Sequence, residues 1–228
     1  MTRTLDRRLW LVAGWLMIGH IVVMFAGNAF EHSLMLGDAP SKAATALVHS
    51  SLATIVAGGY VELLAFLLFL AGATLLAQLL RGEGETGAWL SSCMTAAAGV
   101  YVAVTVATSF AAGAAAVYDG HHGAPLATVT TVNDIRNIGF GLSGAVVGVF
   151  VLAVAAAVQR TGLLPRWVAR TGYVVGALGI AAVPAFRTGV ANISSLLLFI
   201  WVVALGVSAL RTARRGVAAV PVAVSVPA

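Results

Sequence analysis

Long apolar runs dominate the sequence and restrict the folds that the chain can adopt. Six such runs cover about residues 9–29, 48–80, 88–117, 135–158, 167–186 and 190–210. A helix needs roughly 20 apolar residues to cross the hydrocarbon core of a bilayer. A segment in lipid must also satisfy its backbone polar groups internally, so each run is expected to be helical. The sequence therefore predicts an all-α, polytopic protein with six transmembrane helices in a single domain, residues 1–228.

The composition agrees with a membrane protein and argues against a soluble one. Charged residues make up 9% of the chain, against about 25% in soluble domains. The net charge of +5 does not predict a nucleic-acid partner, because the basic residues are scattered over short loops and form no basic face. The single cysteine, Cys93, excludes an intrachain disulfide and a CxxC site. The expected partners are the lipid bilayer and either other membrane subunits or further copies of this chain.

Lysine and arginine predict the orientation. With a cytoplasmic N-terminus, ten of the thirteen lie on the cytoplasmic side, as the positive-inside rule requires. We therefore expect a multi-pass protein of the plasma membrane with both termini cytoplasmic. Residues 211–228 are predicted to form a frayed cytoplasmic tail. Residues 118–134 form the longest segment predicted to be irregular, with room for a loop and one short interfacial helix.

Polar residues inside the apolar runs point to a site that faces outward. His20, Met24 and Asn28 lie four residues apart and share one helical stripe. In the predicted topology, four of the five histidines lie near the outer surface, and His20 and Glu62 lie deeper. The sequence predicts an outward-facing polar cavity that binds a small ligand. Its candidate ligand-binding residues are His20, Met24, Asn28, His49, Glu62, Tyr101 and Asn137.

His20 and Glu62 are the candidates with the highest energetic cost. A charged group at mid-bilayer costs roughly 2.5–3.5 kcal/mol on insertion scales, so such residues are functional candidates. A buried pair, in which the carboxylate orients the imidazole for a ligand or a proton, is one interpretation. A structural hydrogen bond that ties two helices together is the other.

A cofactor site is an alternative use of the same residues. Histidine and methionine serve as axial haem ligands, so His20 with His49 or Met24 is a candidate site for haem b. Thioether and imidazole together suit copper. The candidate metal ligands are His20, Met24, His32 and His49.

Catalytic motifs are absent from the sequence. It contains no GxSxG, HExxH, Walker loop or GxGxxG before a strand, so no enzymatic activity is predicted. Three functions remain open. The first is a ligand-binding membrane protein, or an accessory subunit of a membrane complex. The second is a redox or metal-handling protein with haem or copper. The third is a small proton-coupled transporter.

Glycine pairs occur at Gly144 and Gly148 and again at Gly172 and Gly176. Small residues four apart let helix backbones approach closely, so these pairs predict helix packing. Space for a flat cofactor is the alternative interpretation.

Residues 137–180 resemble a group of uncharacterised bacterial six-helix membrane proteins. The resemblance rests on an asparagine at the start of a glycine-bearing helix, followed by the inner turn Leu-Pro-Arg-Trp at Leu164–Trp167. The alanine, valine and arginine bias is similar to that of actinobacterial proteins. The resemblance implies six helices and carries no functional residues.

Overall fold

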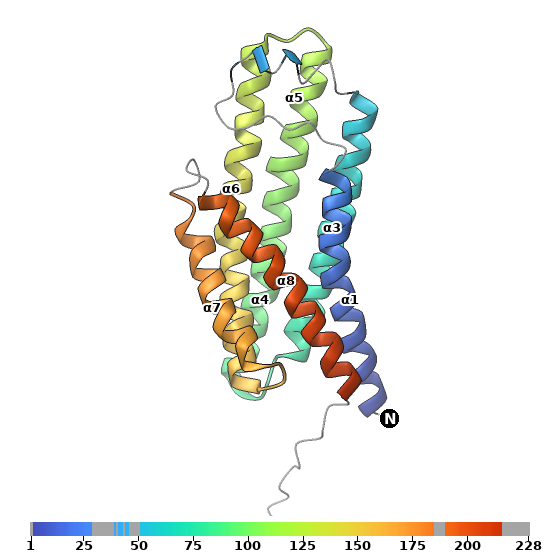
Figure 1. Cartoon of the computed structure of the whole chain (residues 1–228), viewed down its shortest axis with the longest axis vertical. Helices are drawn as coiled ribbons and strands as arrows, with labels where there is room; N and C mark the ends of the chain where they lie inside the picture. The colour runs from blue at the N-terminus through green and yellow to red at the C-terminus, as the bar shows by residue number, and fades with distance from the viewer. Residues whose placement is uncertain are drawn as a thin grey trace, which may run out of the picture.

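The computed structural model describes residues 2–28, 39, 41–42, 44–45, 51–184 and 190–215, and all regular structure in them is helical. The helices are α1 (Thr2–Asn28), α3 (Leu52–Leu79), α4 (Gly84–Thr105), the π-helical turn η1 (Val106–Phe110), α5 (Ala111–His121), α6 (Leu126–Thr161), α7 (Arg166–Ala181) and α8 (Val190–Arg215). Since α4, η1 and α5 follow one another without a break, these segments make six rods (Figure 1). The predicted all-α fold with six helices is confirmed.

Five of the rods are long and apolar enough to cross a membrane: Arg7–Gly27, Leu52–Leu79, Gly84–His121, Leu126–Thr161 and Ile193–Arg215. They support a multi-pass membrane protein. The sixth rod, α7, has 16 residues. At 1.5 Å per residue it is about 24 Å long, which is less than the roughly 30 Å of a hydrocarbon core. In the described residues, the helix that corresponds to the predicted span 167–186 ends at Ala181 and is thus shorter than predicted.

The six rods pack as a closed ring. In the order α1, α3, α4, α6, α7, α8, each helix packs against the next, and α8 packs against α1. One hydrophobic core draws residues from every rod, including Trp10 of α1 and Phe150 of α6. The ring closes where Gly14 of α1 meets Gly206 of α8, because a Cβ atom added at Gly14 would lie 2.8 Å from the Gly206 carbonyl oxygen.

Glycine also sets the distance between α6 and α7. A Cβ atom added at Gly148 would lie 2.7 Å from the carbonyl oxygen of Gly176, and one added at Gly176 would lie 2.8 Å from that of Gly148. The two backbones therefore touch, and the packing interpretation of the glycine pairs is confirmed at these two positions.

The prediction of an irregular segment over residues 118–134 is wrong. Helix α5 continues to His121, and α6 already begins at Leu126. The short connection contains Gly123 with φ +84°, a conformation that glycine adopts without strain. Ala116 of α5 and Val129 of α6 are buried against each other, with Leu126 at the edge of their cluster. This packing stabilises both helices beyond the apolar runs.

The α5–α6 hairpin extends two rods, α4–η1–α5 and α6, beyond the length that a bilayer requires. The α4–η1–α5 rod has 38 residues and α6 has 36, so both exceed about 50 Å in length. Figure 1 shows the hairpin projecting past the upper ends of α7 and α8.

The predicted frayed tail also needs correction. Helix α8 extends to Arg215, so residues 211–215 are helical, and residues 216–228 lie outside the described part. Arginines at a helix C-terminus interact favourably with the helix dipole, which explains the extension.

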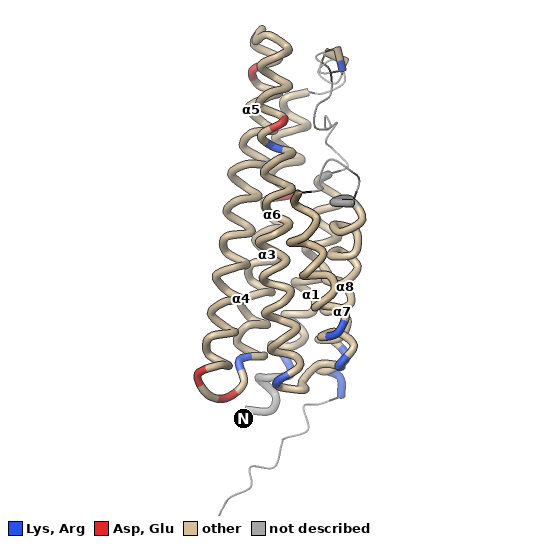
Figure 2. Tube along the Cα trace, turned by 90° about the vertical axis from the view of Figure 1, so that its left-hand side faces the viewer, with Lys and Arg blue, Asp and Glu red and all other residues tan. Residues whose placement is uncertain are grey.

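Basic residues gather at one end of the bundle, the end that holds the start of α1 (Figure 2). The arginines there, all exposed, are Arg7, Arg8, Arg81, Arg160, Arg166, Arg170, Arg211, Arg214 and Arg215. Two exposed tryptophans, Trp89 of α4 and Trp167 of α7, lie within the first two turns of helices that begin at this end. We call it the arginine-rich end.

Candidate functional site

The predicted stripe on α1 faces α3. His20 is 2% exposed and Met24 is 8% exposed. The neighbouring positions on the stripe, Met17 and Gly27, contact Gly72 and Glu62 of α3. The side chain of Asn28 lies outside the described part of the chain. The stripe is therefore buried at the α1–α3 interface.

His20 ties α1 to α3. Its Nδ1 atom lies 2.9 Å from the carbonyl oxygen of Ala65. A carbonyl only accepts hydrogen bonds, so Nδ1 is the donor and carries the proton. The ring lies 5.3 Å from the ring of Phe66 and 5.1 Å from that of Phe69, measured between centroids. This geometry matches the structural interpretation of His20, a hydrogen bond that joins two helices.

Glu62 lies at a different level of the same interface. Its side chain is buried, at 6% exposed, and its Cγ atom would be 2.6 Å from a Cβ atom added at Gly27. Gly27 is seven residues beyond His20, which is about 10 Å along α1. The structure thus brings His20 and Glu62 to one interface about two helical turns apart.

Tyr101 and His20 contact the same two aromatic rings, those of Phe66 and Phe69. The Tyr101 ring lies 5.5 Å from that of Phe66 and 5.2 Å from that of Phe69, and Tyr101 is 4% exposed. Phe66 also contacts Phe110, and Phe69 contacts Phe150. We call these six residues the aromatic cluster: His20, Phe66, Phe69, Tyr101, Phe110 and Phe150. It joins α1, α3, α4, η1 and α6.

The remaining predicted residues do not join this cluster in the described structure. Asn137 is half-buried on α6, and its amide donates a hydrogen bond to the carbonyl oxygen of Asn133, one turn earlier, at 3.0 Å. His32 and His49 lie outside the described residues. A polar cavity around His20, Asn28, His49 and Glu62, with Asn137 as a further ligand-binding residue, therefore stays a prediction.

The metal and haem hypotheses also stay predictions. No three His, Cys, Asp or Glu side chains lie close enough to hold a metal ion among the described residues, and that search did not include His32 and His49. Of the four candidate ligands, the structure describes His20 and Met24, both buried on α1.

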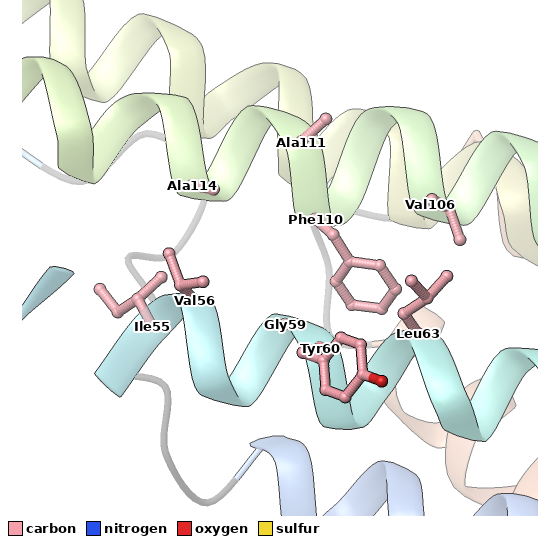
Figure 3. A pocket seen from close by; sticks show the side chains of 9 residues that line it. All are labelled: Ile55, Val56, Gly59, Tyr60, Leu63, Val106, Phe110, Ala111 and Ala114. Atoms are coloured by element: carbon pink, nitrogen blue, oxygen red, sulfur yellow. The ribbon is translucent and has the colours of Figure 1, made fainter. Parts of the chain in front are cut away.

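A cavity of about 260 Å³ lies between α3 and the η1–α5 segment (Figure 3). Its lining is Ile55, Val56, Gly59, Tyr60, Leu63, Val106, Phe110, Ala111 and Ala114. Val56 and Tyr60 are more than half exposed, so this α3–α5 cavity opens on the outside of the bundle. It contains none of the predicted ligand-binding residues. Sequence reasoning missed it because its apolar lining is typical of any membrane helix.

The π-helical turn η1 forms one wall of the α3–α5 cavity. The backbone N–H of Ala111 bonds to the carbonyl oxygen of Val106, five residues earlier. Thr108 packs directly against Gly139 of α6, where any side chain would overlap it. Phe110 contributes both to the cavity wall and to the aromatic cluster. Single π-turns are rare and often mark functional sites.

The chain belongs to the family described as a domain of unknown function, DUF4386, which matches residues 12–212. The predicted resemblance to an uncharacterised family is thus confirmed, and it extends from α1 to α8 rather than over residues 137–180 alone. No curated protein and no solved structure matches the chain.

Proposed function

We propose that this protein binds the apolar part of a small membrane-resident molecule in the α3–α5 cavity. One observation carries the proposal: a cavity of about 260 Å³, lined almost entirely by apolar side chains, opens between α3 and the η1–α5 segment. Small-molecule sites are typically concave and lined mostly by apolar and aromatic side chains. The ligand-binding function predicted from the sequence is retained in this proposal, at an apolar site that is separate from the predicted polar cavity.

The size and lining of the cavity indicate the class of ligand. Small-molecule pockets typically measure roughly 300–1,000 Å³, so this cavity suits an acyl-chain segment or one ring system. Lipid tails are as apolar as the lining, so selectivity must come from packing and hydrogen bonds. The hydroxyl of Tyr60, at the cavity (Figure 3), is placed to bond an ester or a hydroxyl at the polar end of such a molecule.

The proposed orientation puts the cavity in the outer leaflet. The cavity is lined by residues from the start of α3, whereas Arg81 at the arginine-rich end follows the end of α3. If the arginine-rich end is cytoplasmic, as the positive-inside rule favours, the cavity opens into the outer half of the plasma membrane.

Filling the cavity tests the proposal. A Cβ atom added at Gly59 meets no atom within 4 Å, so Gly59→Leu places a side chain in open space beside the ligand. We expect labelling of the purified protein by a diazirine-bearing fatty acid to fall about tenfold, because an overlap of 1–3 kcal/mol opposes binding. Mass spectrometry of the labelled peptides measures the effect.

Gly99→Leu is the matched control. Gly99 also lies inside a helix, α4, and a Cβ atom added there meets nothing within 4 Å. It is not part of the cavity lining, so labelling should match that of the wild type. Unchanged labelling in Gly59→Leu, or labelled peptides that lie outside the cavity lining, would contradict the proposal.

Glu62 favours a proton-coupled transporter as a second candidate. It is an acidic side chain buried inside a helix that is able to span the membrane, and such residues mark proton relays. In vesicles with an internal pH dye and an imposed membrane potential, the wild type should carry a proton flux. Glu62→Gln should abolish this flux, because glutamine keeps the shape and cannot exchange a proton.

The exposed Glu85 of α4 supplies the control, since Glu85→Gln removes the same charge outside the buried interface. Its flux should equal that of the wild type. A Glu62→Gln variant with full flux would rule out this candidate.

A further inference from the structure

Six exposed arginines at the arginine-rich end belong to α6, α7 and α8. They are Arg160, Arg166, Arg170, Arg211, Arg214 and Arg215. We call them the arginine face. Figure 2 shows basic residues gathered at the lower ends of α7 and α8.

The helices of the arginine face carry no acidic residue after Asp134, near the start of α6. The sequence contains no Asp or Glu after Asp134. The opposite side of the same end differs, because Arg81 shares the α3–α4 turn with Glu83 and Glu85. Positive charge on the arginine face is therefore not balanced by nearby carboxylates along the chain.

Packing holds the helix ends of the arginine face together. Thr212 of α8 donates a hydrogen bond to the carbonyl oxygen of Leu163, in the α6–α7 turn, at 3.5 Å. Leu164 of that turn and Ala213 of α8 are both fully buried in the common core. Arg160 and Arg166 flank this turn, and Arg211 directly precedes Thr212. The backbone positions of these three arginines are therefore held by the packing of the turn against α8.

Trp167 supports a position of the arginine face near the headgroup level of a bilayer. It follows Arg166 directly and is 45% exposed. Tryptophan prefers the headgroup level of a bilayer. A guanidinium group binds phosphate oxygens through two parallel hydrogen bonds.

From these observations we propose that the arginine face binds the phosphate groups of anionic phospholipids in the leaflet that surrounds it. The inference is independent of the α3–α5 cavity, which lies toward the other end of the bundle. Lipid is the proposed occupant because the arginines and Trp167 lie together at the end of the bundle where the membrane-length helices α6 and α8 end.

Lipid binding to the purified full-length protein tests the inference. Native mass spectrometry in detergent would count bound phosphatidylglycerol and phosphatidylcholine, each added separately. We expect the wild type to bind phosphatidylglycerol more tightly than phosphatidylcholine. The triple variant R160Q/R170Q/R211Q should lose at least about tenfold in affinity for phosphatidylglycerol, since each arginine near an anionic surface contributes to binding.

The triple variant R7Q/R8Q/R81Q is the matched control. It removes the same charge from exposed positions at the same end, on α1 and in the α3–α4 turn. Its phosphatidylglycerol affinity should stay within about twofold of the wild type, because Asp6 is close to Arg7 and Arg8 in the sequence and Glu83 is close to Arg81, so these arginines attract phosphate less. Equal losses in both variants would show an effect of net charge alone and overturn the inference. Equal binding of the two lipids by the wild type would also overturn it.

A salt titration keeps the inference testable if the first variant does not fold. Raising the salt from 0.1 to 1 M shortens the screening length from about 10 to 3 Å. The wild type should then lose its preference for phosphatidylglycerol while its phosphatidylcholine binding stays constant. A preference that does not depend on salt would overturn the inference.

Discussion

Phe69→Ala is expected to lower the free energy of unfolding by about 3–5 kcal/mol, the range for a buried phenylalanine. Phe69 is 1% exposed and contacts three members of the aromatic cluster, with ring centroids 5.1 Å from His20, 5.2 Å from Tyr101 and 5.2 Å from Phe150. The substitution leaves a void at the centre of the ring of helices, where lipid cannot enter to fill it. Thermal or denaturant unfolding in detergent measures the loss.

Phe140→Ala is the control for this prediction. Phe140 lies on α6 and is 45% exposed, so lipid or detergent can occupy the space that its ring leaves. Its effect should stay below about 1 kcal/mol. Similar losses for the two variants would show that the aromatic cluster does not form the centre of the core.

Gly148→Ala is expected to destabilise the protein by about 1–3 kcal/mol, the usual cost of overpacking. The added Cβ atom would lie 2.7 Å from the Gly176 carbonyl oxygen and 3.0 Å from Cγ1 of Ile180. A backbone oxygen cannot turn aside as a flexible side chain can, so α6 and α7 must separate. Close packing is the main attraction between helices in lipid. No hydrophobic effect replaces the packing contacts that α6 and α7 lose when they separate. The melting temperature in detergent should fall by several degrees.

Gly144→Ala, one turn earlier on the same helix, is the control for this prediction. Its added Cβ atom would meet the Gly179 carbonyl oxygen at 3.9 Å, which is an ordinary contact. Because alanine is the better helix former by about 1 kcal/mol, this variant should be as stable as the wild type or more so. A Gly148→Ala variant that matches Gly144→Ala would refute close backbone packing at this interface.

The number and class of the helices could be predicted from the sequence because bilayer thickness sets the length of an apolar run. The helix ends could not. Thr130, Thr131 and Asn133 are polar, yet they continue α6, because the α5–α6 hairpin has its own small core around Ala116 and Val129. Hydropathy indicates where lipid contact stops, and a helix can extend well past that point.

Part of the candidate site could also be predicted. The spacing of His20 and Met24 indicated a buried stripe, since helical periodicity follows directly from sequence. The level at which that stripe meets α3 could not be predicted, because the offset between two antiparallel helices depends on the connection between them. His20 therefore meets the Ala65 carbonyl, with Glu62 further along the interface beside Gly27.

The α3–α5 cavity had no recognisable sequence signal apart from its small residues. Gly59 on α3 and Ala111 and Ala114 on the facing helix leave space between the helices, but glycine and alanine are common throughout this chain. The π-turn that shapes the wall is one extra residue in a helical repeat. Thr108 of this turn packs against Gly139 of α6, a contact between residues far apart in the sequence.

The closure of the ring by α1 and α8 has a consequence for how the protein is made. Gly14 and Gly206 touch across this seam, and Phe25 meets Phe199 with ring centroids 5.6 Å apart. The two glycines are about 190 residues apart, so at 5–20 residues per second the ribosome needs roughly 10–40 s to supply the second surface after the first. Throughout that interval the face of α1 that later receives α8 is covered by lipid or by the insertion machinery. The seam can therefore form only after α8 is made, when α8 replaces those contacts.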